Sequence, residues 1–459
     1  MLGVRSRSVN FFFCFKLNSE QQYIDLFLQH GALLSAGSHP LIDAHREQAL
    51  EQLRADNLPL RKDERYKYTD VCAMLEPDYG LNLSRLQLPY DPRKAYRCRV
   101  PGLNSRLHYI AGDSVVANND VVNEETLFVG SLVEFAKSRP EVFSTYYNKM
   151  KGDSLAALNT MLVQDGLVIY AGRGRKVEEL IQVVSLAVGG VPMLASRRQL
   201  IILEEGAEVA VLSCNHSATD QENLASEVVE GFLEPNSRLQ YYCVEENGSN
   251  SRLLNNTYFA LRQNSSLEYA SIVLKGGTSR RTVNVALNEP QAEVVASGLV
   301  VADGEMHTDN NLLVCHNAPQ CHSDMLYKYV LDGKSVGAFA GKVFVAQGAQ
   351  KTDSQQTNAN LCVSPEAHIY TQPMLEIYAD DVKCNHGSTI GQLDDLSLFY
   401  MAQRGIAPDE GRLLLQQAFA WEVISRIALP PLRQRMQHLL EERFRFGAGA
   451  CGDCTVCGA

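Results

Sequence analysis

The stretch ILEEGAEVAVL, residues 202–212, decides the predicted fold because three similar stretches follow it at a nearly constant spacing. Each contains an apolar pair, a polar turn, a small residue and then alternating positions. The other three are FLEPNSRLQYY (232–242), ALRQNSSLEYA (260–270) and ALNEPQAEVVA (286–296). Their turns are centred on Gly206, Asn236, Asn264 and Gln291. A repeat of 27 to 30 residues lies within the range of solenoid proteins.

Strand signals dominate residues 165–390 around these repeats, and helical signals nearly vanish there. A βαβ fold needs helices between its strands, and a β-sandwich needs no fixed period. A parallel β-helix fits best, because each rung returns the chain to the same place. Turn chemistry then recurs and apolar residues stack inward. We therefore predict a mainly β protein with a parallel β-helix core at residues 165–390.

Helical signals flank this core on both sides. Residues 20–160 are predicted to form an N-terminal helical and mixed domain. Residues 391–446 are predicted to form a C-terminal domain of three helices, separated by glycine and proline. The Gly-rich residues 447–459 are interpreted as a flexible Cys-rich tail. Residues 1–19 are interpreted as a disordered extension, such as one read from an upstream start codon.

Charge and composition exclude several classes of protein. The 459 residues carry a formal net charge of −11, which disfavours a non-specific nucleic-acid binder or a binder of anionic membranes. No apolar run approaches the ~20 residues of a membrane span. The Phe-rich start lacks the apolar length and the cleavage site of a signal peptide. Twelve cysteines without a disulfide-framework spacing are interpreted as reduced thiols, so we predict a cytoplasmic protein.

Motifs for nucleotide hydrolysis are missing from the sequence. GAFAGKV (337–343) has one residue too few between its glycines, and Val343 stands where a phosphate loop needs a hydroxyl group. We therefore expect that this chain does not hydrolyse ATP. Clustered acids at Asp380-Asp381 and Asp394-Asp395 suggest a carbohydrate-active β-helix as an alternative. However, adjacent residues on a strand face opposite sides, and Asp394-Asp395 stands where a helix cap belongs.

The stretch with the clearest candidate site residues is EIYADDVKCNHGSTIGQLDDLSLFYMAQRGI, residues 376–406. Its alternation predicts a strand over residues 376–384. Cys384 and His386 lie two positions apart, so on an extended chain their side chains point the same way. The apolar helix that follows is expected to dock on the core.

Other cysteines and histidines give weaker signals. Cys315-His316 and Cys321-His322 bracket a loop without the spacing of a metal site, and are interpreted as loop thiols with exposed imidazoles. The tail contains a C-x-x-C-x-x-C pattern, made by Cys451, Cys454 and Cys457. This spacing can place three thiolates on one metal ion or cluster, although no fourth ligand is evident.

Residues 376–406 also carry a family resemblance, together with four other segments. These are GAFAGKVFV (337–345), TDSQQTNANLC (352–362), the helical continuation ending in EVISRI (422–427) and LPLRKDERYKYTD (58–70). The last resembles a Leu-Pro…Lys-x-Glu-x-Trp-Lys-Tyr-Thr segment, with Tyr66 in place of the tryptophan. After about residue 20 the chain resembles the SufB/SufD family of the SUF iron–sulfur cluster assembly machinery. Cys384-Asn385-His386-Gly387 favours the SufD branch, since the SufB branch has a Glu-His-Glu segment before its final helices.

The resemblance implies a right-handed parallel β-helix between two helical domains. It implies a non-catalytic scaffold subunit of a SUF complex, so no enzyme activity is expected of this chain. In that complex a SufB-like paralogue pairs through the β-helix edges, and a SufC-like ABC ATPase binds residues 391–446 and supplies the ATPase activity. His386 matches the family histidine implicated in building the nascent cluster at the SufB–SufD interface, and Cys384 matches its neighbouring thiol.

Thiolate and imidazole are suitable ligands for iron or a forming cluster. We expect iron or an Fe–S cluster to be held there transiently, and no cofactor to be bound stably by this chain alone. FADH2 is a further candidate cofactor of the complex, and a homodimer is a candidate state without SufB.

Two other hypotheses stay open. The first is a carbohydrate-active β-helix enzyme, which an open groove lined by acids and aromatic residues would favour. The second is a stand-alone metal-binding protein that uses the tail cysteines. Loss of metal after deletion of residues 450–459 would favour this second alternative.

Overall fold

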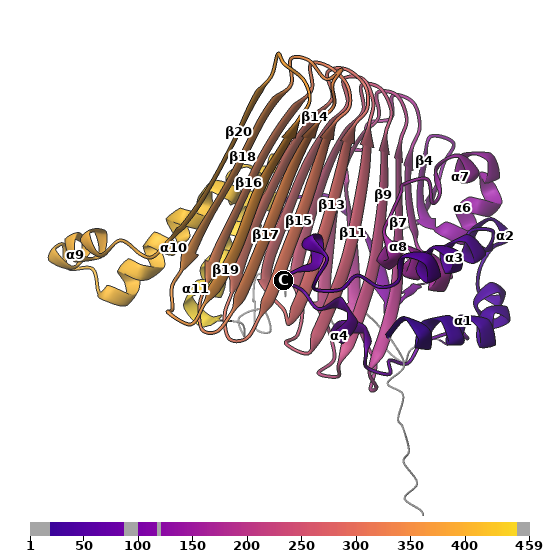
Figure 1. Cartoon of the computed structure of the whole chain (residues 1–459), viewed down its shortest axis with the longest axis horizontal. Helices are drawn as coiled ribbons and strands as arrows, with labels where there is room; N and C mark the ends of the chain where they lie inside the picture. The colour runs from indigo at the N-terminus through magenta and orange to yellow at the C-terminus, as the bar shows by residue number, and fades with distance from the viewer. Residues whose placement is uncertain (1–18, 87–99, 117–120, 448–459) are drawn as a thin grey trace, which may run out of the picture.

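Two long sheets of ten strands each dominate the computed structural model, which describes residues 19–86, 100–116 and 121–447 (Figure 1). From β5 onwards the chain alternates between them, so odd-numbered strands lie in one sheet and even-numbered strands in the other. From β5 and β6 onwards, neighbouring strands within each sheet are parallel and paired without a shift over most of their length. The predicted parallel β-helix is therefore confirmed.

We call the two sheets A and B. Sheet A consists of β3 (Val122–Asn123), β4 (Leu127–Ser131), β5 (Leu167–Ala171), β7 (Met193–Leu203), β9 (Asn223–Leu233), β11 (Ser251–Leu261), β13 (Thr278–Leu287), β15 (His307–His316), β17 (Val336–Val345) and β19 (His368–Ile377). Sheet B consists of β1 (Ser105–Ala111), β2 (Ser114–Val115), β6 (Leu180–Ala187), β8 (Glu208–Ser217), β10 (Arg238–Glu246), β12 (Ser266–Lys275), β14 (Glu293–Ala302), β16 (His322–Leu331), β18 (Asp353–Cys362) and β20 (Lys383–Gly391).

The turns between rungs repeat because each needs a residue with a left-handed backbone. The four predicted turn centres have positive φ angles of 72° at Gly206, 62° at Asn236, 53° at Asn264 and 64° at Gln291. Glycine and asparagine adopt this conformation at the lowest cost. Successive turns are joined by backbone hydrogen bonds, as from Asn236 N to Gln263 O at 2.9 Å. The repeat seen in the sequence is thus a column of stacked turns.

Apolar side chains from both sheets fill the interior of the solenoid. Tyr241, for example, stands opposite Val211 and Tyr269 in sheet B, and each of the three is at most 1% exposed. Burying a large apolar side chain fully contributes about 1.5–3 kcal/mol of stability. Stacked positions of this kind run through the rungs and hold the two sheets together.

Charged side chains also lie inside, a feature that the sequence analysis did not predict. Arg197 and Glu227 form an ion pair of 3.1 Å, and Asn215 and Asn255 donate to the same carboxylate. All four side chains are buried. Removing one partner of a buried ion pair typically costs about 3–5 kcal/mol, because the other charge remains buried without compensation.

His316 gives a pH dependence of stability that can be tested. Its side chain is fully buried, and Nε2 lies 2.9 Å from the Ser323 hydroxyl. Burial lowers the pKa of His316 to about 4, and His322 adds to this effect. Below pH 6.5 the unfolded chain takes up the proton first, so stability should fall between pH 6.5 and about 4. The slope from this group is at most about 1.4 kcal/mol per pH unit.

Urea unfolding at several pH values checks this prediction. Replacing His316 by glutamine should flatten the slope in that window, whereas a His30→Gln control changes an exposed histidine of α1 and should keep it. Equal slopes in the wild type and in His316→Gln would contradict the prediction.

Helices cover sheet A at the N-terminal end (Figure 1). The larger group is α1 (Ser19–Ala36), α3 (Arg46–Asp56) and α8 (Ser154–Leu162), which packs on Leu194, Leu224 and Leu254 of sheet A. The smaller helices are α2 (Pro40–Asp43), α4 (Val71–Leu75), α6 (Leu132–Ser138) and α7 (Pro140–Tyr146). The same region also adds strands, because β1 pairs with β6 and β4 pairs with β5.

Up to residue 447, where the described residues end, three helices follow β20: α9 (Asp395–Gln403), α10 (Pro408–Ile424) and α11 (Pro430–Phe446). Helices α10 and α11 pack on the outer face of sheet B, where Val423 and Leu439 join one apolar cluster with Leu212 and Leu299. Helix α9 lies at the far end of the C-terminal helices, away from the solenoid (Figure 1).

Two expectations for residues 376–406 are wrong. The predicted strand at 376–384 is a corner, because β19 ends at Ile377 and β20 begins at Lys383. Alternation continues through the corner because Ala379 turns inward and packs on the core. Helix α9 does not dock: it has no buried residue. Its apolar face is therefore left uncovered by the described residues.

Candidate functional site

The solenoid has an open end at its last rung. In the part of the chain that the structure describes, β19 and β20 end the two sheets, and each has a neighbour on one side only. The other end is formed by β2 and β3, which have two residues each and run antiparallel to their neighbours. Short edge strands resist pairing with another chain, whereas a long edge presents a row of unpaired backbone groups. The last rung is therefore the end suited to a partner.

Cys384 and His386 lie on β20, at this open end. Cys384 stands opposite Ser354 of β18, and His386 stands opposite Gln356. Both partners on β18 are at most 1% exposed and face the interior. Cys384 and His386 therefore occupy interior positions of a rung that no later rung covers in the described part of the chain. Cys384 is half-buried against the core, and His386 is exposed.

The thiol of Cys384 is held in its neutral form in this chain. Partial burial raises the pKa of Cys384 above its usual range, and the Asp353 carboxylate adds to the rise. A thiolate is the form that binds iron. A metal ion or a cationic group brought to this edge would lower the pKa again. Binding of iron by Cys384 therefore depends on a metal ion or a cationic group that comes from outside this chain.

A hydrogen-bonded group of three side chains lies next to these two residues. Thr371 of β19 donates to Asn358 Oδ1 at 2.8 Å, and its hydroxyl lies 2.7 Å from that of Ser388. Ser388 is two positions after His386 on the same strand. The three residues join β18, β19 and β20 across the interior of the last rung. They fix the backbone on which His386 stands.

The other predicted cysteine and histidine positions do not come together. His316 is buried, which corrects the expectation of an exposed imidazole, and Cys321 is also buried. Within residues 19–86, 100–116 and 121–447, no group of three or more His, Cys, Asp or Glu side chains is arranged to hold a metal ion. Cys451, Cys454 and Cys457 lie outside the described residues.

The acidic residues considered for carbohydrate chemistry lie in two different places: Asp394 serves as a helix cap, and Asp380 and Asp381 lie in a corner between strands. Asp394 caps α9, since its carboxylate accepts from the backbone N–H groups of Leu396 and Ser397. Asp380 and Asp381 lie in the corner before β20, where the Asp381 N–H donates to Gln350.

None of the helices in the described ranges has the length and apolarity to cross a membrane.

Helix α9 exposes a large apolar face. Leu396 is 77% exposed, Phe399 62% and Tyr400 57%. Positions three and four apart share one side of a helix, so these side chains form one continuous patch. Patches of this kind mark sites where another protein binds. The sequence showed the apolar run but not that it would stay uncovered.

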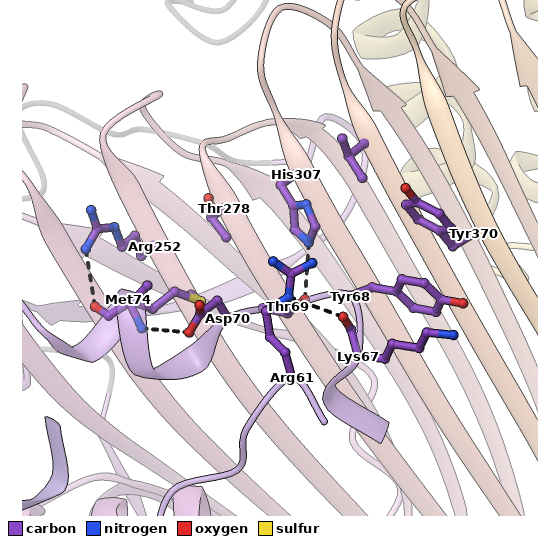
Figure 2. A pocket seen from close by; sticks show the side chains of 12 residues that line it. Arg61, Lys67, Tyr68, Thr69, Asp70, Met74, Arg252, Thr278, His307 and Tyr370 are labelled. Atoms are coloured by element: carbon purple, nitrogen blue, oxygen red, sulfur yellow. Dashed lines mark hydrogen bonds between the residues drawn. The ribbon is translucent and has the colours of Figure 1, made fainter. Parts of the chain in front are cut away.

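A cleft of 830 Å³ lies between sheet A and the segment that links α3 to α4 (Figure 2). Arg252, His307 and Tyr370 line it from the sheet, and Tyr68 and Thr69 from the segment. Most of its polar groups already have partners within the chain. Thr69 Oγ1 lies 3.1 Å from His307 Nε2, and Arg252 donates to the Tyr79 hydroxyl and to Met74 O. The cleft is thus open, but several of the polar groups that line it are already engaged within the chain.

Comparisons with known proteins cover almost all of the chain. Residues 187–419 match the family model "SUF system FeS cluster assembly, SufBD core domain", and residues 17–183 match "SufBD protein N-terminal region". The iron-sulfur cluster assembly protein SufD of Escherichia coli is 26% identical, with 94% of this chain and 98% of that protein covered. An iron-sulfur cluster assembly SufBD family protein of Synechocystis is also 26% identical, over 91% and 94% of the two chains. The chloroplastic protein ABCI7 of Arabidopsis thaliana is 27% identical, over 86% and 84%.

Proposed function

Because this chain belongs to the SufBD family of the SUF iron–sulfur cluster assembly system, we propose that it is a non-catalytic scaffold subunit of a SUF complex. In this proposal it pairs with a SufB-like paralogue and binds a SufC-like ABC ATPase. The complex builds and transfers nascent Fe–S clusters in the cytoplasm. The family resemblance predicted from the sequence is confirmed, and relatives named SufD are among the matches.

The single observation that carries the proposal is the open last rung with Cys384 and His386 on it. The ten residues of β19 and the nine of β20 leave backbone groups free to pair with a second solenoid. Strand addition of this kind supplies affinity through main-chain hydrogen bonds. Without the paralogue, the same edge is suited to a second copy of this chain.

Cys384 and His386 are the proposed ligands for the cargo of the complex. Thiolate and imidazole both bind iron, and the family of Fe–S sites includes sets that mix the two. Two ligands are too few for a stable cluster, which takes four in its common forms. The partner must therefore supply the rest, and the cluster is held transiently. FADH2 in the complex stays a prediction of the family resemblance.

The uncovered face of α9 is the proposed contact with the ATPase. Helices α10 and α11 are fixed to sheet B, so movement of the ATPase would reach the solenoid through them. The chain itself has no phosphate loop for ATP hydrolysis in its sequence. The proposal thus assigns the energy source to the partner and the scaffold to this chain.

Co-expression with both partners tests the proposal. We expect a tag on this chain to retain a SufB-like chain and an ABC ATPase through affinity purification and gel filtration. A monomer that elutes alone in the presence of both partners would refute it. The variant Thr389→Lys places a charge on the open edge and should reduce pairing with the SufB-like chain.

Removing the tail separates this proposal from that of a stand-alone metal-binding protein. We expect deletion of residues 450–459 to leave the iron content of the co-expressed complex unchanged, because the proposed ligands are on β20. The measurement is iron and acid-labile sulfide per complex after anaerobic purification. A loss of most of the iron on deletion would favour metal binding by Cys451, Cys454 and Cys457 instead.

A further inference from the structure

The segment from Leu58 to Asp70, which we call the strap, crosses the outer face of sheet A between α3 and α4. It includes a short 3-10 turn at Glu64–Tyr66. Tyr66 anchors it in the middle of the sheet through two contacts. The Tyr66 hydroxyl donates to Asp153, and the Arg280 guanidinium lies 4.0 Å from the centre of the Tyr66 ring. These contacts tie the strap to β13 and to the N-terminal helices.

Further anchors lie on β15. Thr69 Oγ1 donates to Asp309 Oδ2 at 2.6 Å, and Arg65 donates to Asn311 Oδ1 at 3.0 Å. Tyr66 and Thr69 are both buried. These contacts hold the strap in one conformation over the centre of the solenoid. A segment held in this way can fix the position of the strand that it contacts beyond β15.

The far side of the strap reaches the last rung. The Tyr68 ring stacks on the Tyr370 ring, with centres 4.4 Å apart and planes inclined by 13° (Figure 2). Gln372 Nε2 donates to Glu64 Oε1 at 3.0 Å. In the described ranges, these are the only hydrogen bonds, ion pairs or ring contacts between β19 or β20 and an element outside the solenoid. The strap therefore supports a rung that has no neighbouring rung on one side.

The two strap contacts are placed so that they act on β20 as well. Tyr370 and Gln372 face outward on either side of Thr371, which faces the interior and contacts Ser388. Ser388 stands two positions after His386. A short path of direct contacts thus runs from the strap through β19 to the strand that carries His386.

We propose that the strap is a positioning element for the open edge. By clamping β19 it holds the last rung in register, so that β20 meets its partner with His386 and Cys384 correctly placed. Tyr68 is the main positioning residue, because its ring stacks on Tyr370, whereas the hydrogen bond between Gln372 and Glu64 is exposed. The importance of the edge rests on the proposed function, whereas the clamp itself is a property of the isolated chain.

Terminal rungs open locally at lower free energy than central ones, so amide hydrogen exchange reports the clamp directly. In Tyr68→Ala we expect exchange in peptides spanning 368–377 and 383–391 to be about three- to tenfold faster, the range for losing one aromatic pair. Tyr68→Phe retains the ring and should exchange like the wild type. Lys62→Ala changes an exposed strap residue and serves as the control. Peptides from β8 to β12 should be unaffected in all variants.

The second arm uses the co-expressed complex. Tyr68→Ala should weaken binding of the SufB-like partner and lower cluster yield, and Tyr68→Phe should restore both. Unchanged exchange at β19 and β20 in Tyr68→Ala overturns the clamp. Faster exchange with wild-type binding and cluster yield overturns the positioning role. A wild-type chain that binds no partner rejects the proposed function instead, and the exchange arm then still decides whether the clamp exists.

Discussion

Replacing both Leu396 and Phe399 by aspartate should abolish detectable binding of the SufC-like ATPase. These side chains are 77% and 62% exposed, and α9 buries no residue of its own. Two large apolar side chains buried in an interface contribute about 3–6 kcal/mol together, and two carboxylates there would add a desolvation cost. We therefore expect binding to weaken by at least about a hundredfold, as measured by isothermal titration or by a pull-down.

The fold should survive this change, because the apolar core does not use α9. Thermal unfolding of the double variant should match that of the wild type. Gln29→Asp with Gln48→Asp adds the same charge on exposed positions of α1 and α3, and should leave ATPase binding intact. Wild-type affinity in the α9 variant would show that the ATPase contacts another surface.

Replacing His386 by alanine should lower cluster formation at least tenfold while the complex remains assembled. The imidazole is exposed on an interior position of the last rung, so its removal takes away a ligand without opening a cavity. Reconstitution with iron and sulfide under anaerobic conditions, followed by absorption spectroscopy, measures the loss. Gel filtration of the same preparation measures assembly.

Asn385→Ala is the matched control for this variant. Asn385 is exposed on the same strand, but its position alternates with that of His386 and faces outward. Cluster yield in Asn385→Ala should equal that of the wild type. If His386→Ala dissociates the complex, the histidine has a structural role and not the ligand role proposed here.

The repeat was readable from the sequence because each rung needs the same turn. Gly206, Asn236, Asn264 and Gln291 all have positive φ, and this demand leaves a local signal at a constant spacing. One helix cap was readable for the same kind of reason, because Asp394 caps α9 through its own carboxylate.

Features that depend on distant contacts left no such signal. An apolar helix looks the same in sequence whether its own chain or a partner covers it, so the exposure of α9 could not be foreseen. Tyr68 and Tyr370 stack although they lie far apart in the chain, and their pairing has no local pattern. Pro373 is a signal that could have been used: it lacks an N–H, and proline within sheets is confined to edges and bulges, which fits β19 as a terminal strand.

The interior charges were hidden for a related reason. Arg197 and Glu227 follow the alternation of their strands, but an alternating charged residue normally indicates a solvent face. Their pairing depends on the register between β7 and β9, which places residue 197 opposite residue 227. Register across a long rung is set by the whole repeat and cannot be read from either strand alone.

The most direct test of the central claim is the iron and sulfide content of this chain, purified anaerobically alone and after co-expression with a SufB-like chain and a SufC-like ATPase. The account predicts little metal on the isolated chain and near-stoichiometric iron and sulfide on the three-component complex, with the gain lost in His386→Ala. A stable cluster on the isolated chain, or a complex whose cluster content ignores His386, would contradict it.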